Sequence, residues 1–480
     1  MLFNSIDFVI FLPIVFILYW FVTNGNLRLQ NILLVISSYV FYGWWDWRFL
    51  LLILFSSVLD YLVGIGLLKN ENVIKRKLLL LTSIIINLTF LGFFKYYNFF
   101  IDNFSRVFVF LGKEINIRHL NIILPVGISF YTFQTLSYSI DVYKKNITPT
   151  KDFVAFTAFV SFFPQLVAGP IERATNLLPQ FYKKRKFDYN NAVDGCKQIL
   201  WGFFKKIVIA DTCAQYVDMI FNGYSEYNGL VLLFGAFFFA IQIYGDFSGY
   251  SDIAIGVSRL FGFSLIQNFS FPYFSRDIAE FWRRWHISLT TWFRDYVYIP
   301  LGGSRKGILI SIRNTFIIFL ISGFWHGARW TFVIWGLLNA LYFLPLLITK
   351  NNRKNIGIVA AGKYFPTIKE LLCIFITFLL TSFAWIFFRS GSVSSSIMYI
   401  SRIFTTKFFI ISPFVISKGF FFKMFLIVLF VLIEWIGREN LYAIENIHLN
   451  KQLRWLLYYG ILACIIIFSG VSQSFIYFQF

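Results

Sequence analysis

The chain has 480 residues, of which 58% are hydrophobic and only 14% are charged. Soluble domains carry about 25% charged residues, so this composition excludes an ordinary soluble protein and indicates a polytopic membrane protein. The formal net charge is +20. The lysines and arginines nevertheless collect in short loops between apolar stretches, which is typical of membrane topology and requires no nucleic-acid partner.

Apolar stretches long enough to cross a membrane recur along the whole chain. They lie near residues 8–22, 31–44, 50–67, 78–95, 152–169, 228–245, 307–323, 331–348, 370–388, 421–436 and 455–470. More mixed regions at 97–112, 121–142, 192–220 and 250–300 are expected to hold shorter, tilted or re-entrant helices. The sequence therefore predicts an all-α polytopic protein with about 11 or more transmembrane helices.

The ends of the chain and its basic loops suggest how this fold is oriented. The first apolar stretch follows Asp7 without a basic region, and no small-residue cleavage site comes after it, so we expect a retained span. The basic loops near 69–77, 183–186, 305–306, 351–369 and 438–454 should face the cytoplasm. Counting spans from these loops places both termini outside the cytoplasm. We expect one membrane-embedded domain over residues 1–480, with an outward-facing tail at 471–480.

The first polar cluster in chain order covers residues 163–173. Pro164 and Pro170 break an apolar stretch that ends in the charge pair Glu172–Arg173. Such a break at membrane depth is tolerated only inside protein or beside a wet cavity. We expect a kinked entrance to a cavity, in which the charge pair is structural or lines the cavity.

The four cysteines do not form a recognisable site. Cys196, Cys213, Cys373 and Cys464 are far apart, and no CxxC or Cys/His pair occurs. We therefore expect core packing rather than a disulfide framework or a metal site. The chain also has no Gly-rich phosphate loop with Lys and Ser or Thr and no Ser/His/Asp motif, so ATP-driven transport is unsupported.

A run of polar residues from 242 to 252 ends the apolar stretch at 228–245. It places Asp246, Ser248 and Asp252 together. Carboxylates here can orient a histidine or pair with arginines further along the chain. A buried structural ion pair is the alternative.

The next cluster interleaves basic and aromatic residues between 281 and 296. Arginine stacks on aromatic faces and holds phosphate or carboxylate with a planar fork. The cluster therefore fits a cytoplasmic site for a phosphate-bearing carrier, whereas the alternative is an interfacial helix with snorkelling arginines. Its members are Trp282, Arg283, Arg284, Trp285, His286, Trp292, Arg294, Asp295 and Tyr296.

His326 stands in the run Gly323-Phe324-Trp325-His326-Gly327-Ala328-Arg329-Trp330, between long apolar stretches. The chain has only four histidines. A histidine at membrane depth is a functional-site hypothesis by default, and imidazole suits proton transfer near neutral pH. The topology places His326 in the middle or outer half of the membrane. The alternative is a histidine hydrogen-bonded inside a helix bundle.

Together these runs resemble the membrane-bound O-acyltransferase superfamily, in particular its branch of alginate and peptidoglycan O-acetylation proteins. The resembling segments are 124–134, 165–173, 246–252, 281–303, 324–330 and 383–389. The resemblance implies a ring of helices around a central funnel in a bacterial inner membrane. It also implies transfer of an acetyl group from a cytoplasmic thioester, such as acetyl-CoA or another phosphopantetheine thioester, to an extracytoplasmic polysaccharide. No permanently bound cofactor or metal is expected.

The same resemblance implies roles for individual residues. His326 would be the catalytic base and His286 a second important histidine. The donor would be held by the arginines and tryptophans of the aromatic cluster. The donor-binding residues are then Arg283, Arg284, Arg294, Trp282 and Trp285, and the orienting or channel residues are Gln134, Asp246, Ser248, Asp252, Asp295, Trp325 and Trp330.

The tail ends in Phe475-Ile476-Tyr477-Phe478-Gln479-Phe480. It looks like the C-terminal aromatic motif of teichoic-acid D-alanylation systems, in which a tyrosine carries the acyl group in transit. The hypothesis is that Tyr477 takes the acyl group and passes it to an extracytoplasmic hydrolase-like partner, because a phenyl ester remains an activated donor. An aromatic interfacial anchor is the alternative.

Other functions remain open at this point. D-alanyl transfer to teichoic acid is the main alternative within the resemblance, and a transporter or flippase without chemistry would use a similar charged cavity. Among polymers, we favour peptidoglycan over alginate or another exopolysaccharide.

Overall fold

The described residues of the computed structural model, 1–113, 118–406, 418–447, 449–470, 473 and 475–476, form helices and no strand. Eight of these helices are long and apolar enough to cross a membrane, and they coincide with eight of the stretches expected from hydropathy. The other three expected stretches form shorter helices over Ile6–Val22, Leu27–Gly43 and Phe153–Leu166. The predicted all-α polytopic fold is confirmed.

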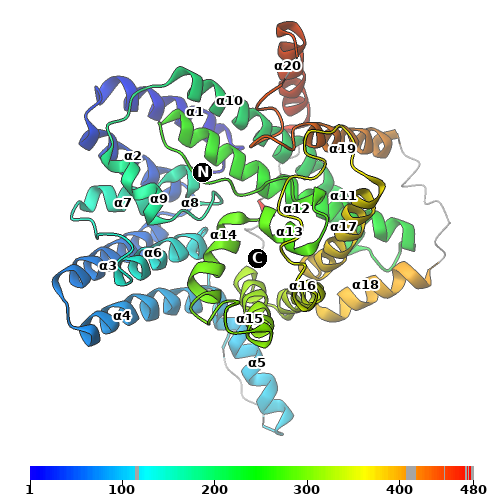
Figure 1. The fold of residues 1–480 in the computed structure, drawn as a ribbon, viewed down its shortest axis with the longest axis horizontal. Coiled ribbons are helices and arrows are strands. Elements are labelled where there is room, and N and C mark those ends of the chain that lie inside the picture. Colours follow the sequence, from blue (N-terminus) through cyan, green and yellow to red (C-terminus); the bar gives the residue numbers. More distant parts are fainter. Residues whose placement is uncertain (114–117, 407–417, 448, 471–472, 474, 477–480) are drawn as a thin grey trace. The chain divides into compact units, whose positions relative to one another are not determined.

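The chain divides into two compact units. Unit 1 comprises residues 1–192 and 257–266, and unit 2 comprises residues 193–256 and 267–480. Unit 1 contains α1 (Ile6–Ile17), α2 (Leu27–Gly43), α3 (Leu50–Lys69), α4 (Val73–Leu91), α5 (Tyr97–Phe110), α6 (Ile128–Tyr143), α7 (Phe153–Ser161), α8 (Phe163–Leu166) and α9 (Ala174–Leu177) (Figure 1). That these units act as a single embedded domain stays a prediction.

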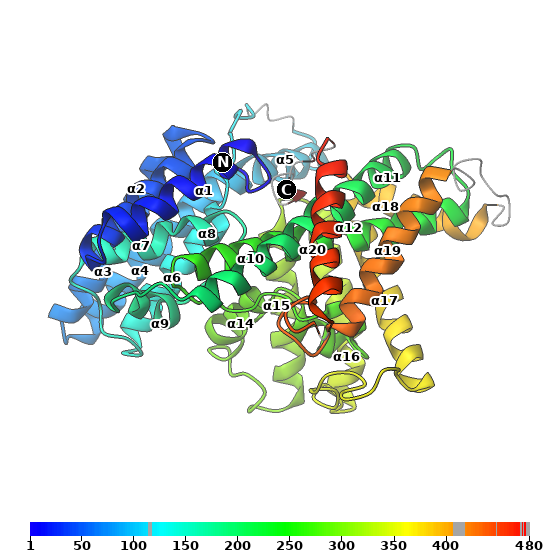
Figure 2. The ribbon, with the colours of Figure 1, turned by 90° about the horizontal axis from the view of Figure 1, so that it is seen from above.

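Unit 2 holds both histidines of interest and most of the longer helices. Helices α10 (Tyr189–Phe203) and α12 (Gly229–Leu260) each have residues assigned to both units, with 193–203 and 229–256 in unit 2. The others are α11 (Asp211–Asn222), α13 (Ile278–Arg284), α14 (Ile287–Phe293), α15 (Ile308–His326), α16 (Trp330–Ile348), α17 (Ile368–Arg389), α18 (Val393–Thr405), α19 (Lys418–Ile436) and α20 (Lys451–Phe468) (Figure 2).

Helices α15 and α16 form a tightly packed hairpin, visible in both views (Figures 1 and 2). Glycines permit this close approach: a Cβ at Gly323 would lie 2.2 Å from the carbonyl oxygen of Phe332, and one at Gly336 would lie 2.2 Å from that of Phe319. Small residues are the usual means by which membrane helices pack backbone to backbone. The hairpin thereby brings α16 against the end of α15, where His326 lies.

A second close contact joins α10 and its continuation to α12. After Phe203 the helix becomes a π-helix, η5 (Phe204–Ala210), before α11 begins. A Cβ at Gly249 of α12 would lie 2.7 Å from the carbonyl oxygen of Gly202, and a Cβ at Gly245 would lie 3.0 Å from that of Lys205. Single π turns inside α-helices often occur at functional sites. Here the π turn carries adjacent lysines, Lys205 and Lys206, against α12.

Two sequence expectations about local structure are refined by the fold. The polar run around Asp246 does not end a helix, because α12 continues through it to Leu260. The break near Pro164 is present, and it separates α7 from α8 at Phe162. In unit 1, Glu172 accepts hydrogen bonds from the backbone N–H of Ile266 at 2.6 Å and from Asn176 at 2.8 Å, which gives it a structural role.

Candidate functional site

His326 ends α15 and is enclosed by aromatic rings. Its side chain is buried, and its ring centroid lies 4.9 Å from that of Trp325, 5.1 Å from Trp335 and 5.2 Å from Phe388. Trp335 comes from α16 and Phe388 from α17, so three helices fix the imidazole. Such an enclosure excludes bulk water, which limits hydrolysis of an activated acyl group.

His286 is held in an unusual backbone conformation by a polar group. Its φ is +43°, in the left-handed region, which costs a residue with a side chain about 1–2 kcal/mol. Its Nδ1 lies 3.1 Å from Oδ1 of Asn268, which also accepts from the hydroxyl of Ser288 at 2.8 Å. The amide of Asn268 in turn donates to Ser251 at 3.1 Å. Strained residues that are held by their surroundings tend to cluster at functional sites.

The contacts of Asn268 assign a tautomer to His286. Because Oδ1 of the amide can only accept, Nδ1 of the imidazole carries the proton and Nε2 carries the lone pair. Burial lowers the pKa of His286 to about 3, so the ring is neutral at physiological pH. A neutral imidazole with its lone pair on Nε2 is the form that accepts a proton.

Trp325 connects the two histidines. Its ring centroid is 4.9 Å from that of His326 and 6.2 Å from that of His286, so both imidazoles contact the same indole. The structure therefore brings together the two histidines that the sequence singled out. Trp330, also assigned to this group from the sequence, begins α16 and is half exposed.

Asp246 and Asp252 of α12 pair with lysines in a buried charge cluster, whereas the sequence had offered arginines as their partners. Nζ of Lys206 is 2.7 Å from Oδ1 of Asp246 and 2.7 Å from Oδ1 of Asp211. Burial opposes the charge of Lys206, but the two carboxylates outweigh it and raise the pKa, so the lysine is protonated. Next to it, Lys205 pairs with Asp252, which also accepts from Gln198 at 2.8 Å.

These contacts change the interpretation of the polar run in α12. Asp246 and Asp252 pair with lysines of the π turn, and Ser248 donates to the carbonyl of Tyr244 in its own helix at 2.6 Å. The lysines were missed from the sequence, although a Lys-Lys pair inside the apolar run 201–210 was a signal. Asn268 left no comparable signal, because it stands alone in an irregular segment.

The described end of the C-terminal tail lies against this cluster. The backbone carbonyl of Gln473 accepts from Lys206 at 3.1 Å, and the backbone N–H of Ile476 donates to Asp246 at 2.7 Å. The ring of Phe475 lies 4.3 Å from that of Tyr250 and 6.1 Å from that of Phe247. Phe247 contacts the ring of His286 at 4.6 Å, so the tail reaches the site through one aromatic residue. Tyr477 itself lies outside the described residues.

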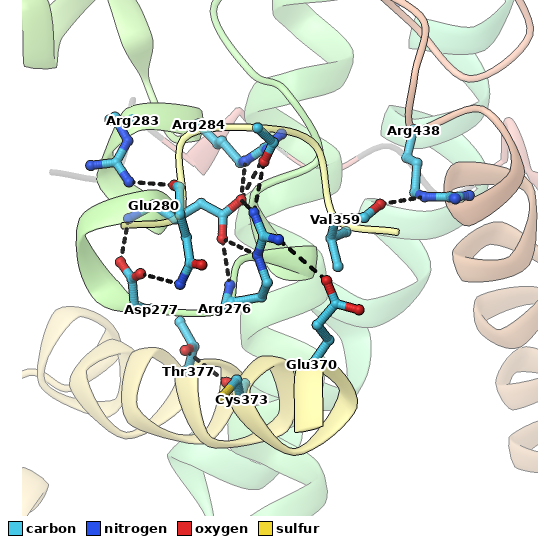
Figure 3. A network of polar contacts seen from close by, with 12 residues as sticks. Arg276, Asp277, Glu280, Arg283, Arg284, Val359, Glu370, Cys373, Thr377 and Arg438 are labelled. Carbon is cyan, nitrogen blue, oxygen red and sulfur yellow. Dashed lines mark hydrogen bonds and ion pairs between the residues drawn. The ribbon is translucent and has the colours of Figure 1, made fainter. Parts of the chain in front are cut away.

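Two of the three arginines expected to bind a donor, Arg283 and Arg284, take part in a polar network around Glu280 and Asp277 (Figure 3). Arg284 and Arg276 both pair with Glu280, at 2.9 and 3.0 Å. Arg283 donates to the backbone carbonyls of Asn352 and Asn355 at 2.9 and 2.7 Å. In this structure the two arginines thus hold the basic loop that follows α16, and their binding of a donor stays a prediction.

The remaining predicted site residues are spread over both units. Arg294 pairs with the neighbouring Asp295 at 2.7 Å and is largely exposed. Trp282 donates to Asn339 at 3.2 Å, and the ring of Trp285 lies 5.1 Å from that of Trp385. Gln134 belongs to unit 1, where it donates to the carbonyl of Phe159 at 2.6 Å.

Comparison with known proteins gives one family and several relatives. Residues 39–388 match the family described as MBOAT, membrane-bound O-acyltransferase family. A "Probable alginate O-acetylase" of Pseudomonas aeruginosa is 40% identical over 396 residues, which cover 82% of this chain and 73% of that protein. A "Peptidoglycan O-acetyltransferase" of Helicobacter pylori is 35% identical over 426 residues, covering 83% and 78%. A "Teichoic acid D-alanyltransferase" of Bacillus subtilis is 29% identical over 230 residues, covering 46% and 58%.

Proposed function

The chain belongs to the membrane-bound O-acyltransferase family, and we propose that it takes an acetyl group from a cytoplasmic thioester and passes it across the inner membrane to acetylate an extracytoplasmic polysaccharide. Relatives named for alginate and for peptidoglycan acetylation, each matched over most of both chains, support acetyl transfer. The relative named for D-alanyl transfer matches less than half of this chain, which makes that reaction the second candidate. Peptidoglycan remains the polymer that we favour.

The observation that carries the proposal is the enclosure of the two histidines around Trp325, with Phe475 of the tail linked to His286 through Phe247. In the proposed reaction, His326 acts as the base, and Tyr477 is the nucleophile. The phenol oxygen of Tyr477 attacks the thioester carbonyl while the histidine takes its proton. The C–S bond then breaks, and the leaving thiolate receives the proton, which yields a free thiol and an acetyl ester on Tyr477.

The second half of the proposal concerns the outer partner. An aryl ester is an activated acyl donor because phenoxide leaves more readily than an alkoxide. A hydrolase-like partner on the outer side would accept the acetyl group and place it on the polysaccharide. The phenol of Tyr477 regains its proton in that step and is ready for another cycle.

The donor is proposed to be acetyl-CoA or another phosphopantetheine thioester. Arg283, Arg284 and Arg294 would hold its phosphates, and Trp282 and Trp285 would support them. In this role, Arg283 would exchange its backbone carbonyl partners for phosphate oxygens. Arg284 would exchange Glu280 for them. Arg294 is exposed and pairs with Asp295 alone among the described groups.

Tyr477→Phe tests the proposal, because it removes one hydroxyl oxygen and keeps the ring. We expect loss of polymer O-acetylation, measured by mass analysis of purified polysaccharide, with unchanged amounts of folded protein. Tyr459→Phe, at an exposed tyrosine of α20, is the matched control and should acetylate normally. Normal acetylation in Tyr477→Phe would refute the tail's role, and alanyl instead of acetyl esters in the wild type would favour the second candidate.

A further inference from the structure

We propose that Lys206 and Asp246 form a backbone clamp that holds the C-terminal tail next to His286. Both are positioning residues, and the consequence for acetyl transfer rests on the function proposed above. The clamp itself is a physical property of the chain that can be measured without any substrate.

The clamp contacts the tail backbone through two hydrogen bonds. Lys206 donates to the carbonyl of Gln473 at 3.1 Å, and Asp246 accepts from the N–H of Ile476 at 2.7 Å. One point binds an acceptor and the other a donor, so together they fix both the position and the direction of the segment. Because both contacts are to backbone groups, the side chains of Gln473 and Ile476 do not set the register. Tyr477 follows the clamped amide by one peptide bond.

The charges of the cluster explain why the tail binds. Lys206, Asp211 and Asp246 have side chains that are 1%, 3% and 3% exposed. One ammonium group faces two carboxyl groups, so the carboxyl oxygens of the cluster can accept more hydrogen bonds than Lys206 alone donates. Buried charges are stable only when further hydrogen bonds satisfy their remaining atoms. The N–H of Ile476 supplies such a bond to Asp246, and the carbonyl of Gln473 supplies one to Lys206.

The clamp is held rigidly by the packing of the π turn on α12. Gly245 and Gly249 let the backbones of η5 and α12 approach closely: a Cβ at Gly245 would lie 3.0 Å from the carbonyl oxygen of Lys205, and one at Gly249 would lie 3.1 Å from the backbone nitrogen of Lys206. The side chain of Lys206 therefore starts from a fixed backbone directly opposite Asp246. In a continuous α-helix the residues of this segment would lie at different angles around the helix axis, which would change the direction in which the Lys206 side chain leaves the backbone.

Aromatic contacts give the tail its side-chain specificity. Phe475 is fully buried, with Tyr250 at 4.3 Å and Phe247 at 6.1 Å between ring centroids. Phe247 meets His286 edge to face at 4.6 Å. The clamp thus fixes the backbone position of the tail, and the aromatic contacts place Phe475 against Phe247, which contacts His286. Removing the clamp should release the tail without altering the histidines themselves.

Hydrogen–deuterium exchange of the purified full-length protein tests the clamp directly. The amide of Ile476 in the wild type should exchange slowly, because it donates to buried Asp246. Lys206→Gln removes the charge-assisted bond to the carbonyl of Gln473, so the tail should open more often and the amide of Ile476 should exchange about tenfold faster or more. Lys197→Gln is the matched control. Lys197 lies on α10, which η5 continues, and it pairs with Asp194 at 3.1 Å and with the carbonyl of Glu445 at 3.0 Å, so its loss should leave the tail unchanged.

A second variant avoids the buried cluster altogether. Ile476→Pro removes the one N–H that Asp246 accepts, because proline has no amide hydrogen. We expect it to reduce polymer acetylation by about tenfold or more, whereas Ile476→Val, which keeps the N–H, should acetylate normally. Ile476→Pro therefore still tests the clamp if Lys206→Gln fails to fold.

Unchanged exchange in folded Lys206→Gln would overturn the clamp, and so would full acetylation by Ile476→Pro in cells whose polymer acetylation is lost when this chain is deleted. A failure of the proposed function has a different signature. In that case deleting the chain would leave polymer acetylation unchanged, while the amide of Ile476 would still be protected in the wild type and exposed in Lys206→Gln.

Discussion

Nζ of Lys206 lies 2.7 Å from a carboxylate oxygen of Asp246, and both side chains are almost fully buried. The pair joins a π turn to the middle of a 32-residue helix and stands where the described end of the chain returns to the core. On the far side of Phe247 is His286, which shares the indole of Trp325 with His326. Charge cluster, tail and histidines are therefore linked within one unit.

Asn268→Leu should reduce acetyl transfer by about tenfold to a hundredfold, by analogy with the loss of the hydrogen-bond partner that orients a metal-ligating histidine. The change removes the acceptor that keeps the proton on Nδ1 of His286, at similar side-chain volume. Acetyl transfer in isolated membranes is the measurement. Ser251→Ala, which removes only the contact to the amide nitrogen of Asn268, should have a smaller effect. Full activity of folded Asn268→Leu would show that the tautomer is set otherwise.

Gly336→Ala should destabilise unit 2 by about 1–3 kcal/mol, because overpacking forces backbones apart. The added Cβ would lie 2.2 Å from the carbonyl oxygen of Phe319 on the other helix of the hairpin. A lower melting temperature and a smaller amount of folded protein in detergent are expected. Gly460→Ala is the control, since Gly460 is also helical but has open space around it. An unaltered melting temperature for Gly336→Ala would contradict the close packing of α15 on α16.

The stability of the protein should depend on pH through His286. Burial lowers its pKa to about 3, below the ordinary value of about 6.5, so between these values the unfolded chain binds a proton that the folded chain does not. This group therefore costs no stability above pH 6.5 and destabilises the fold increasingly as pH falls towards 3. At pH 4.5 the cost is about 3 kcal/mol.

A comparison of the wild type with His286→Gln isolates the contribution of His286 to the pH dependence of stability. The difference in melting temperature between the two should change in favour of His286→Gln as pH is lowered from 7 to 4.5. All other titrating groups are common to both proteins and cancel. A difference that does not vary with pH would mean that His286 is protonated or solvated in the folded state.

Hydropathy predicted most of the fold, because a span must be apolar over its whole length whatever its neighbours. Eight of the expected stretches are full-length helices. The stretch at 31–44 was overestimated: in α2, buried polar residues such as Ser37 and Ser38 interrupt the apolar pattern. The continuity of α12 through Asp246 was not predictable from that helix alone, because its charges are compensated by Lys205 and Lys206 from a different segment.

The candidate site was predicted in part. The two histidines stood out by their scarcity and their aromatic neighbours, and the structure brings both to Trp325. The partners of the arginines could not be predicted, since Arg283 contacts backbone carbonyls, which every residue carries. The contacts between the clamp and the tail could not be predicted for the same reason, because they involve the backbone of Gln473 and Ile476.

The central claim is that His326 supports acetyl transfer to the polysaccharide. The most direct measurement is the O-acetyl ester content of purified envelope polysaccharide from cells that carry His326→Ala in place of the wild-type chain. His119→Ala, at an exposed histidine of unit 1 that pairs with Asp102, serves as the control. We predict that His326→Ala lowers the ester content to that of cells lacking the chain, while His119→Ala leaves it at the wild-type value. Wild-type ester content in His326→Ala cells, with normal amounts of the protein in the membrane, would contradict the account.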